Sequence, residues 1–388
     1  MQMRFKTPTR RRIPMPFRAG FFKYPIHNKL AYFFIACTDW LLQRCLAKKK
    51  LPIKIPKRIL ICNTAHLGDV ILTTALLPVL RQALPHAHIA MLVGSWCQPL
   101  VEKHPLLDHF HVIDHWKTSR RKENRIIKIV RYLKMRGRVC KEIRNYDLAI
   151  DCGLHFPNMA PLLWSAGIPT RIGFASAGLG PLLTHARPWN PFDNRSVVES
   201  FASLLYFLPI HIDHTLLHPT IPISLPNPKS YIVVHMGSGN AHKNWPEANW
   251  KALAKRLAEE GRHLLFTGIG KEENQAIERV IAHFPQAENL CGKLSWQQFT
   301  TTIQNAALLI ATETSAGHIA SAVGTPAVLL YTGIHPSNVW RPLGNEQHIL
   351  THPTPCSPCL KGCKAMSCIR EISVDTLYAA IQSHQKVC

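Results

Sequence analysis

The stretch RILICNTAHLGDVILTTALLPVLRQALP, residues 58–85, joins an apolar run to a helix-like pattern. The run at 58–62 is short and apolar enough for a buried parallel strand, and the helical pattern behind it ends at Pro85. Between the two lies Asp69, which follows a glycine and is the single acid of the stretch. A carboxylate where a strand passes into a helix is a candidate for chemistry, and an aspartate that only caps the helix is the alternative.

Short apolar runs alternate with longer amphipathic segments along the rest of the chain. This alternation is typical of parallel sheets, because each crossover helix returns the chain to the same edge. Further strands are predicted at 88–93, 110–114, 147–151, 231–235, 263–268, 308–312 and 327–331. Helices are predicted near 69–84, 120–144, 195–208, 247–260, 271–283, 295–306 and 316–323.

The segment HPTIPISLPNPKS, residues 218–230, contains four prolines and divides the two series of strands. Proline fixes φ and removes a backbone donor, so this segment is the natural linker. A chain of 388 residues also exceeds the size at which a single core usually keeps growing. We therefore expect an α/β protein with two Rossmann-like domains, 58–222 and 223–388, whose parallel sheets face a central cleft.

The net charge of +23 is concentrated in two segments. Residues 1–57 hold 14 Lys and Arg against one acid, and residues 117–144 hold 12 against two. Such segments suit a polyanion, whether a nucleic acid, an anionic membrane or a phosphorylated substrate, and a solvated basic face is the plain alternative. Nucleic acid is disfavoured as a partner, because no nucleic-acid-binding motif accompanies the charge.

The apolar segment at 30–46 is interrupted by Asp39, Gln43 and Arg44, so it is too short to cross a bilayer. It has the pattern of an amphipathic helix with basic flanks. Such a helix lies either on an anionic membrane surface or on the body of its own protein, and the sequence leaves both open.

Four of the 12 cysteines cluster near the C-terminus as CSPCLKGCKAMSC, giving Cys356, Cys359, Cys363 and Cys368. This spacing suits zinc, an iron–sulfur cluster, disulfides or reduced structural thiols, depending on the compartment. Whether a metal binds there is left unknown by the sequence.

Two strand ends in the second half have residues suited to an anion. After the strand at 231–235, the glycines of MGSGNAHK let backbone amides approach a phosphate, with Ser238 and Gly239 in the turn and Lys243 as a positive charge. After the strand at 308–312, the segment ETSAGH opens a helix whose N-terminal amides attract a pyrophosphate. There Thr314 and Ser315 would donate to phosphate oxygens, Glu313 would accept from a ribose hydroxyl, and His318 would reach the anion.

Four blocks, at 59–85, 235–250, 290–328 and 356–381, give the chain a specific resemblance to glycosyltransferase family 9, the ADP-heptose:lipopolysaccharide heptosyltransferases. The resemblance runs from about Arg58 to the C-terminus. It implies an inverting transferase of the GT-B type that needs no cofactor and moves a heptose or related sugar. The donor would be a nucleotide sugar, ADP-heptose, and the acceptor the lipopolysaccharide core or a related glycan.

The resemblance also implies roles for individual residues. Asp69 would be the general base, and Ser238, Gly239 and Lys243 would hold the donor diphosphate together with Thr314, Ser315 and His318. One departure concerns the Asp-Thr-Gly usual in the family, which here reads Glu313, Thr314, Ser315. The longer carboxylate and the lost glycine bear on how closely the nucleotide approaches.

The acceptor implied by the resemblance is an anionic glycolipid at a membrane. Residues 117–144 would then line the acceptor groove, and residues 1–57 would tether a cytoplasmic enzyme to the inner face of the cytoplasmic membrane. Two alternatives are a catalytically altered family member that binds nucleic acid or anionic surfaces, and a metal-linked interaction protein organised by the terminal cysteines.

Overall fold

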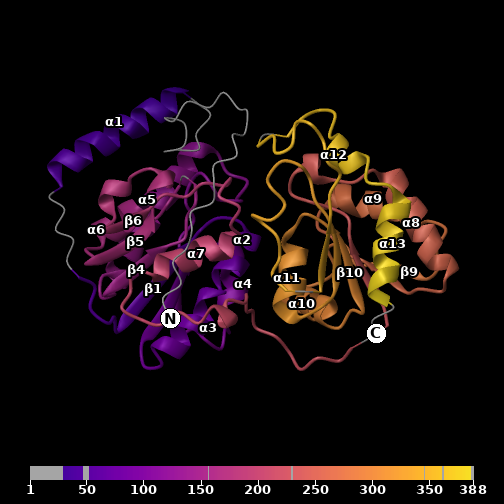
Figure 1. Ribbon diagram of the computed structural model, residues 1–388, viewed down its shortest axis with the longest axis horizontal. Coiled ribbons are helices and arrows are strands. Elements are labelled where there is room, and N and C mark those ends of the chain that lie inside the picture. The colour runs from indigo at the N-terminus through magenta and orange to yellow at the C-terminus, as the bar shows by residue number, and fades with distance from the viewer. Residues whose placement is uncertain are drawn as a thin grey trace, which may run out of the picture.

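The computed structural model describes residues 29–46 and 52–385, except residues 156, 229, 345 and 361. They form two six-stranded parallel sheets, each with helices on both faces (Figure 1). We refer to the first sheet and its helices, 58–205, as the N-terminal lobe, and to the second sheet and its helices, 232–385, as the C-terminal lobe. In Figure 1 the two lobes lie side by side, the first on the left.

The strands of the N-terminal lobe have the order β3-β2-β1-β4-β5-β6. This is the strand order of the dinucleotide-binding Rossmann fold. The four predicted strands are confirmed to within two residues, whereas β5 and β6 were not predicted. The strands are β1 Arg58–Asn63, β2 His88–Val93, β3 His109–Val112, β4 Leu148–Asp151, β5 Thr170–Phe174 and β6 His185–Arg187.

The C-terminal sheet repeats the same topology, with the order β12-β11-β10-β7-β8-β9. Here too the inner strands are confirmed and the edge strands β9 and β12 were not predicted. The strands are β7 Ile232–His235, β8 Leu264–Phe266, β9 Ala287–Asn289, β10 Leu308–Thr312, β11 Ala327–Leu330 and β12 Gln347–Leu350. The two-domain α/β architecture expected from the sequence is therefore present.

Helices cover both faces of each sheet. One predicted helix, 69–84, is wrong as a single element, because the chain turns at Thr74 and Ala75 and two helices result. The helices of the first part are α1 Lys29–Cys45, α2 Leu67–Thr73, α3 Leu76–Ala83, α4 Gln98–Val101, α5 Arg125–Ile143, α6 Ala160–Ser165 and α7 Val197–Leu205. Those of the second are α8 Glu247–Glu259, α9 Lys271–Ile281, α10 Trp296–Gln304, α11 Ser315–Val323, α12 Ser367–Arg370 and α13 Val374–Gln385.

The alternation of side chains along β1 shows which helices share a face of the first sheet. Ile59 and Ile61 belong to the core that contains α2, α3 and α7, whereas Leu60 and Cys62 belong to the core that contains α5 and α6. The first of these cores continues into the C-terminal lobe through α11. Thus α2 and α7 lie on the side of the other lobe, and α5 and α6 lie on the outer side (Figure 1).

The two lobes touch through α2 and α11 and through one backbone hydrogen bond, in which Val197 N donates to Val339 O at 2.8 Å. The proline-rich linker contains no helix or strand in its described residues. It is fixed to the N-terminal lobe, because Thr220 N donates to Thr74 Oγ1 at 2.9 Å.

The helix predicted at 30–46 is observed as α1. It packs on the body of the protein on one side, where Asp39 is buried and its Oδ1 accepts from Leu179 N at 2.8 Å. Its other side carries exposed apolar residues, among them Phe33 and Trp40. Across the residues that the model describes, no helix is long and apolar enough to span a bilayer.

Candidate active site

Asp69 lies in the first turn of α2, directly after β1. Its Oδ2 accepts a hydrogen bond from His66 N at 2.8 Å and so completes a capping box at the start of the helix. Asp69 therefore does cap the helix, the alternative that the sequence left open, but only one of its two carboxylate oxygens takes part. Asp69 Oδ1 accepts no hydrogen bond from the residues that the structure describes, and the side chain is 15% exposed.

The topology places this carboxylate at the carboxyl end of β1. β1 pairs with β2 on one side and with β4 on the other, so the chain reverses its direction of winding at the carboxyl end of β1. Ligands of open α/β sheets bind at such a reversal point. The C-terminal lobe has its own reversal point between β7 and β10, which carry the two anion-suited segments.

The turn after β7 is shaped by its glycines and by Ser238. A Cβ on Gly237 would lie 2.2 Å from the Glu273 carboxyl carbon, so a larger residue there would displace the Glu273 carboxylate. Ser238 Oγ donates toward Asn240 O and Asn244 Oδ1 at 2.6 and 2.8 Å, so its hydroxyl holds the turn together. Gly239 faces open space, which leaves its backbone accessible.

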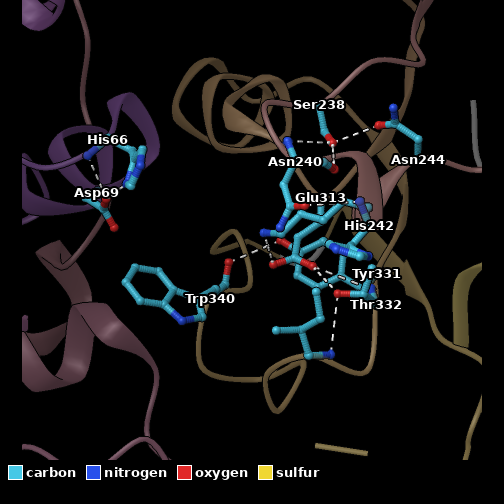
Figure 2. A network of polar contacts seen from close by, with 12 residues as sticks. His66, Asp69, Ser238, Asn240, His242, Asn244, Glu313, Tyr331, Thr332 and Trp340 are labelled. Atoms are coloured by element: carbon cyan, nitrogen blue, oxygen red, sulfur yellow. Dashed lines mark hydrogen bonds and ion pairs between the residues drawn. The ribbon is translucent and has the colours of Figure 1, made fainter. Parts of the chain in front are cut away.

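Lys243, Glu313 and Thr332 form a chain of contacts across the ends of three strands. Figure 2 shows Glu313 beside Thr332. Lys243 Nζ donates to Glu313 Oε1 at 2.7 Å, and Thr332 Oγ1 donates to Glu313 Oε2 at 2.9 Å. The Glu313 side chain is 9% exposed and the Lys243 side chain is 23% exposed. The predicted cation and the predicted carboxylate are thus brought together, in contact with each other.

The start of α11 has polar groups without partners. Thr314 is its N-cap residue, yet its side chain makes no capping hydrogen bond, and its buried Oγ1 has no partner among the described residues. Nδ1 of His318, one turn further on, is buried and unpartnered in the same sense. Buried polar atoms of this kind usually have a partner, so the pair fits an anion at the helix N-terminus.

His318 also links the two lobes. A Cβ on Gly68 would lie 2.8 Å from its Cδ2, so the imidazole packs directly on the backbone beside Asp69. Burial lowers the pKa of His318 to about 4, while the charges of Asp69 and Glu313 act in the opposite direction. The ring is therefore neutral at physiological pH and within electrostatic reach of both carboxylates.

Several charged and titratable groups act on His155, Asp69 among them. Burial lowers the pKa of His155, and Asp69 opposes this, whereas His335, Lys117 and His66 add to it. Lys117, at the start of the basic segment 117–144, is therefore within electrostatic reach of His155, as Asp69 is. Arg120 lies over the Trp96 ring, whereas Arg125–Ile143 form α5 on the outer face of the sheet, away from α2.

The structure adds site residues that the sequence interpretation missed. Thr332 and Tyr331 follow β11 immediately and face Glu313, whose charge together with burial raises the pKa of Tyr331. Tyr331 Oη donates to Trp340 O at 3.1 Å, which brings that loop toward Asp69 and His66 (Figure 2). The rule applied to β7 and β10, that polar residues after a strand reach the ligand edge, would have identified Thr332.

The terminal cysteines lie near the segment that follows β7. They line, with His242, His352 and Gly333, a cavity of about 350 Å³. Cys356, Cys359, Cys363 and Cys368 are free thiols, and within the described part of the chain no three His, Cys, Asp or Glu side chains are grouped so as to hold a metal ion. Metal binding by this cluster stays an open prediction.

Comparisons with known proteins agree with this geometry. The family model "Glycosyltransferase family 9 (heptosyltransferase)" matches residues 136–370. Lipopolysaccharide heptosyltransferase 1 of Pseudomonas aeruginosa is 27% identical over 326 residues, covering 78% of this chain and 86% of its own. Lipopolysaccharide heptosyltransferase 2 of Escherichia coli K12 is 24% identical over 297 residues, covering 71% and 82%.

Solved structures show the same fold. A glycosyltransferase of family 9 from Veillonella parvula superposes with a TM-score of 0.71 at 21% identity, over 86% of this chain and 98% of its own. The E. coli heptosyltransferase WaaC with ADP gives 0.68 at 18% identity, over 84% and 99%. The alternative of a nucleic-acid or anionic-surface binding protein finds no support in these comparisons. The chain has the GT-B fold and belongs to glycosyltransferase family 9, the heptosyltransferases.

Proposed function

We propose that this transferase moves a heptose from ADP-heptose to the core of a lipopolysaccharide. Its lipopolysaccharide heptosyltransferase relatives support the acceptor, and a similar E. coli heptosyltransferase has been solved with ADP-2-deoxy-2-fluoro heptose. The observation that carries the proposal is a pairing of opposites between the two lobes. Asp69 Oδ1 accepts no hydrogen bond from the described residues, and its helix α2 contacts α11 of the lobe that holds Lys243 and the unpartnered Thr314 and His318 atoms.

In this proposal residues 58–222 bind the acceptor and residues 223–388 bind the donor. Asp69 accepts the proton of the acceptor hydroxyl while that oxygen bonds to the anomeric carbon of the sugar. The bond from the anomeric carbon to the diphosphate breaks on the opposite face, so the configuration inverts. A positioned base of this kind is typically worth about 10²- to 10⁴-fold in rate.

The leaving ADP gains negative charge, and the C-terminal lobe has the groups to stabilise it. Lys243 would exchange part of its contact with Glu313 for the diphosphate, while the amides of Ser315 and the next residues of α11, with the Thr314 hydroxyl, would donate to phosphate oxygens. Ser238 and Gly239 would shape the turn that approaches it, and His318 would contribute Nδ1. Because these groups carry the charge, we propose that transfer requires no metal cofactor.

The acceptor side of the proposal is an anionic glycolipid. His66 Nδ1 lies 3.3 Å from Asp69 Oδ2, and His155 is within electrostatic reach of both Asp69 and Lys117. These three basic residues would meet the acceptor's phosphate or carboxylate groups. We further propose that the enzyme works on the inner face of the cytoplasmic membrane, with the basic segment 1–57 as a tether. Most of that segment lies outside the described residues.

A panel of nucleotide sugars would test the donor. A ligand that binds the native state raises the apparent stability with its concentration, so ADP-heptose and ADP should raise the melting temperature, and UDP- and GDP-sugars should not. Transfer is then measured by mass spectrometry with a heptose-deficient core oligosaccharide. Stabilisation by a different nucleotide sugar, together with transfer of its sugar, would overturn the assignment.

A further inference from the structure

Two helices on the outside of the N-terminal lobe expose apolar residues opposite the side on which they pack. α1 packs through Asp39 and through Leu42 and Leu46, which contact the small core formed by Ala160, Leu182 and Leu183. Its opposite side exposes Phe33 by 61% and Trp40 by 51%, with Phe34 and Leu41 next to them.

α5 repeats this arrangement. Val139 and Ile143 are fully buried against the first sheet. The opposite side carries Ile126, Val130 and Leu133 at helical spacing, with Ile126 exposed by 73% and Leu133 by 56%. A single exposed apolar residue needs no explanation, but a row of them on each of two neighbouring helices marks an interaction surface.

α6 connects the two rows. It shares the core of α1 through Ala160, and it contacts α5, since Arg136 Nη2 donates to Pro161 O at 3.5 Å and Cys140 Sγ to Leu162 O at 3.8 Å. Its Trp164 is half exposed. In Figure 1, α1 lies above α5 and α6 at the upper left of the molecule, on the side away from the C-terminal lobe.

The charge of this surface indicates its partner. α5 carries exposed Lys134, Arg138 and Lys141 beside its apolar row, and the segment 117–144 has 12 basic residues against two acids. On α1 the Arg44 guanidinium stacks over the Trp40 ring at 3.8 Å. Cores of protein–protein interfaces are depleted in charge, whereas interfacial membrane helices combine Trp, Phe and Leu with a basic flank.

We propose that α1, α6 and α5 together form a surface that docks on an anionic lipid leaflet, with the apolar rows inserted among the acyl chains and the cations at the headgroups. We refer to Phe33, Phe34, Trp40, Leu41, Ile126, Val130, Leu133 and Trp164 as the docking surface. The inference rests on the membrane tether of the proposed function and deepens it, because it gives the tether a defined surface and assigns α5 to the membrane instead of the acceptor groove.

Vesicle sedimentation tests the proposal with the full chain. Wild type should bind phosphatidylcholine vesicles only when phosphatidylglycerol is included, and high salt should weaken binding. The variant Ile126→Gln/Val130→Gln/Leu133→Gln should bind about tenfold more weakly or worse, because its apolar side chains no longer insert. A matched control is Ile223→Gln/Leu225→Gln/Ile269→Gln, which removes three exposed apolar residues elsewhere and should bind as wild type does.

Two further measurements make each outcome decisive. Lipids brominated on the acyl chains should quench Trp40 and Trp164, so Trp40→Phe/Trp164→Phe should lower the quenching while vesicle binding persists. Transfer to a water-soluble core oligosaccharide should be unchanged in the α5 variant, which separates a failure of docking from a failure of the proposed activity. Equal binding by the α5 variant and wild type would overturn the proposal. So would a wild-type dimer in solution that the α5 variant converts to monomers.

Discussion

The two lobes share one topology and differ in the chemistry placed at the same point of it. Each sheet has the Rossmann strand order, and each reverses its winding at a central strand. In the N-terminal lobe that point holds one carboxylate, Asp69, and one of its two oxygens caps its own helix. In the C-terminal lobe it holds Lys243, which is paired with Glu313, and Thr314, whose hydroxyl has no partner among the described residues. The fold therefore provides the position, and in the proposed function the residues after each strand determine whether that position serves proton transfer or anion binding.

The largest effect is expected at Asp69, and the contrast between the lobes would be lost if Asp69 served only as a helix cap. Asp69→Asn keeps an oxygen for His66 N but cannot accept the acceptor proton, so turnover should fall by about 10²- to 10⁴-fold with ADP affinity near normal. Steady-state transfer and calorimetric ADP titration would measure the two effects.

The chain offers a matched control for this variant. Glu199 completes the same capping box at the start of α7, with Ser196 as its partner. Glu199→Gln should leave turnover unchanged, since Gln298 already fills that position in the box of α10. Similar losses of turnover in both variants would reduce Asp69 to a structural residue.

Lys243→Ala addresses the other lobe. Hydrogen bonds to charged groups are worth more than neutral ones, so ADP affinity and kcat/KM should each fall by about 10- to 100-fold. Lys255→Ala removes another lysine paired with a glutamate, on the surface of α8, and should change neither. Unaltered ADP affinity in the Lys243 variant would show that Lys243 does not bind the donor.

Thr314→Val should have a smaller effect: it should weaken ADP binding without lowering the stability of the fold. The hydroxyl is buried and unpartnered among the described residues, so its loss should leave the free energy of unfolding unchanged or higher. Its loss should weaken ADP by less than about tenfold. Thr325→Val, which removes the bond from Oγ1 to Ile303 O, should instead lower stability without affecting ADP. A destabilised Thr314 variant with normal ADP affinity would contradict the assignment.

The smallest effect on transfer is expected from His235, whose protonation should affect the stability of the fold. Burial lowers the pKa of His235 to about 4 from an ordinary value of 6.5. Between these values the unfolded chain binds a proton that the folded chain does not, so stability is lost as the pH falls from about 6.5 toward 4.

His235→Gln should flatten that dependence by up to about 1.4 kcal/mol per pH unit. Urea unfolding at several pH values would measure it, and identical slopes for the variant and wild type would refute the neutral, buried state of the ring.

Sequence was sufficient for the inner strands and insufficient for the edges. β1, β7 and β10 are buried on both faces, so they read as apolar runs. The edge strands β6 and β9 have three residues each and are half exposed, and nothing distinguishes HAR or AEN from a loop. The predicted helix 69–84 divides at Thr74, because its hydroxyl donates back to Ile71 O and accepts from the linker at Thr220 N.

The site was predictable where it depends on residues next to a strand, and not where it depends on how two lobes meet. Asp69, Lys243 and Glu313 each follow a strand, and their positions could be inferred along the chain. The packing of His318 on Gly68 joins residues of different lobes, so no local pattern contains it. The partner of α1 was open as well, since an amphipathic pattern does not distinguish a membrane surface from the body of the protein.

The contact between Lys243 and Glu313 has a consequence for the end of the catalytic cycle. An ammonium that tightly holds ADP would slow the departure of the product. Here a carboxylate 2.7 Å away is ready to take the cation back, and Thr332 keeps that carboxylate in place. Glu313 would therefore compete with the nucleotide for Lys243. The longer side chain found where the family usually has aspartate would then set how readily ADP is released.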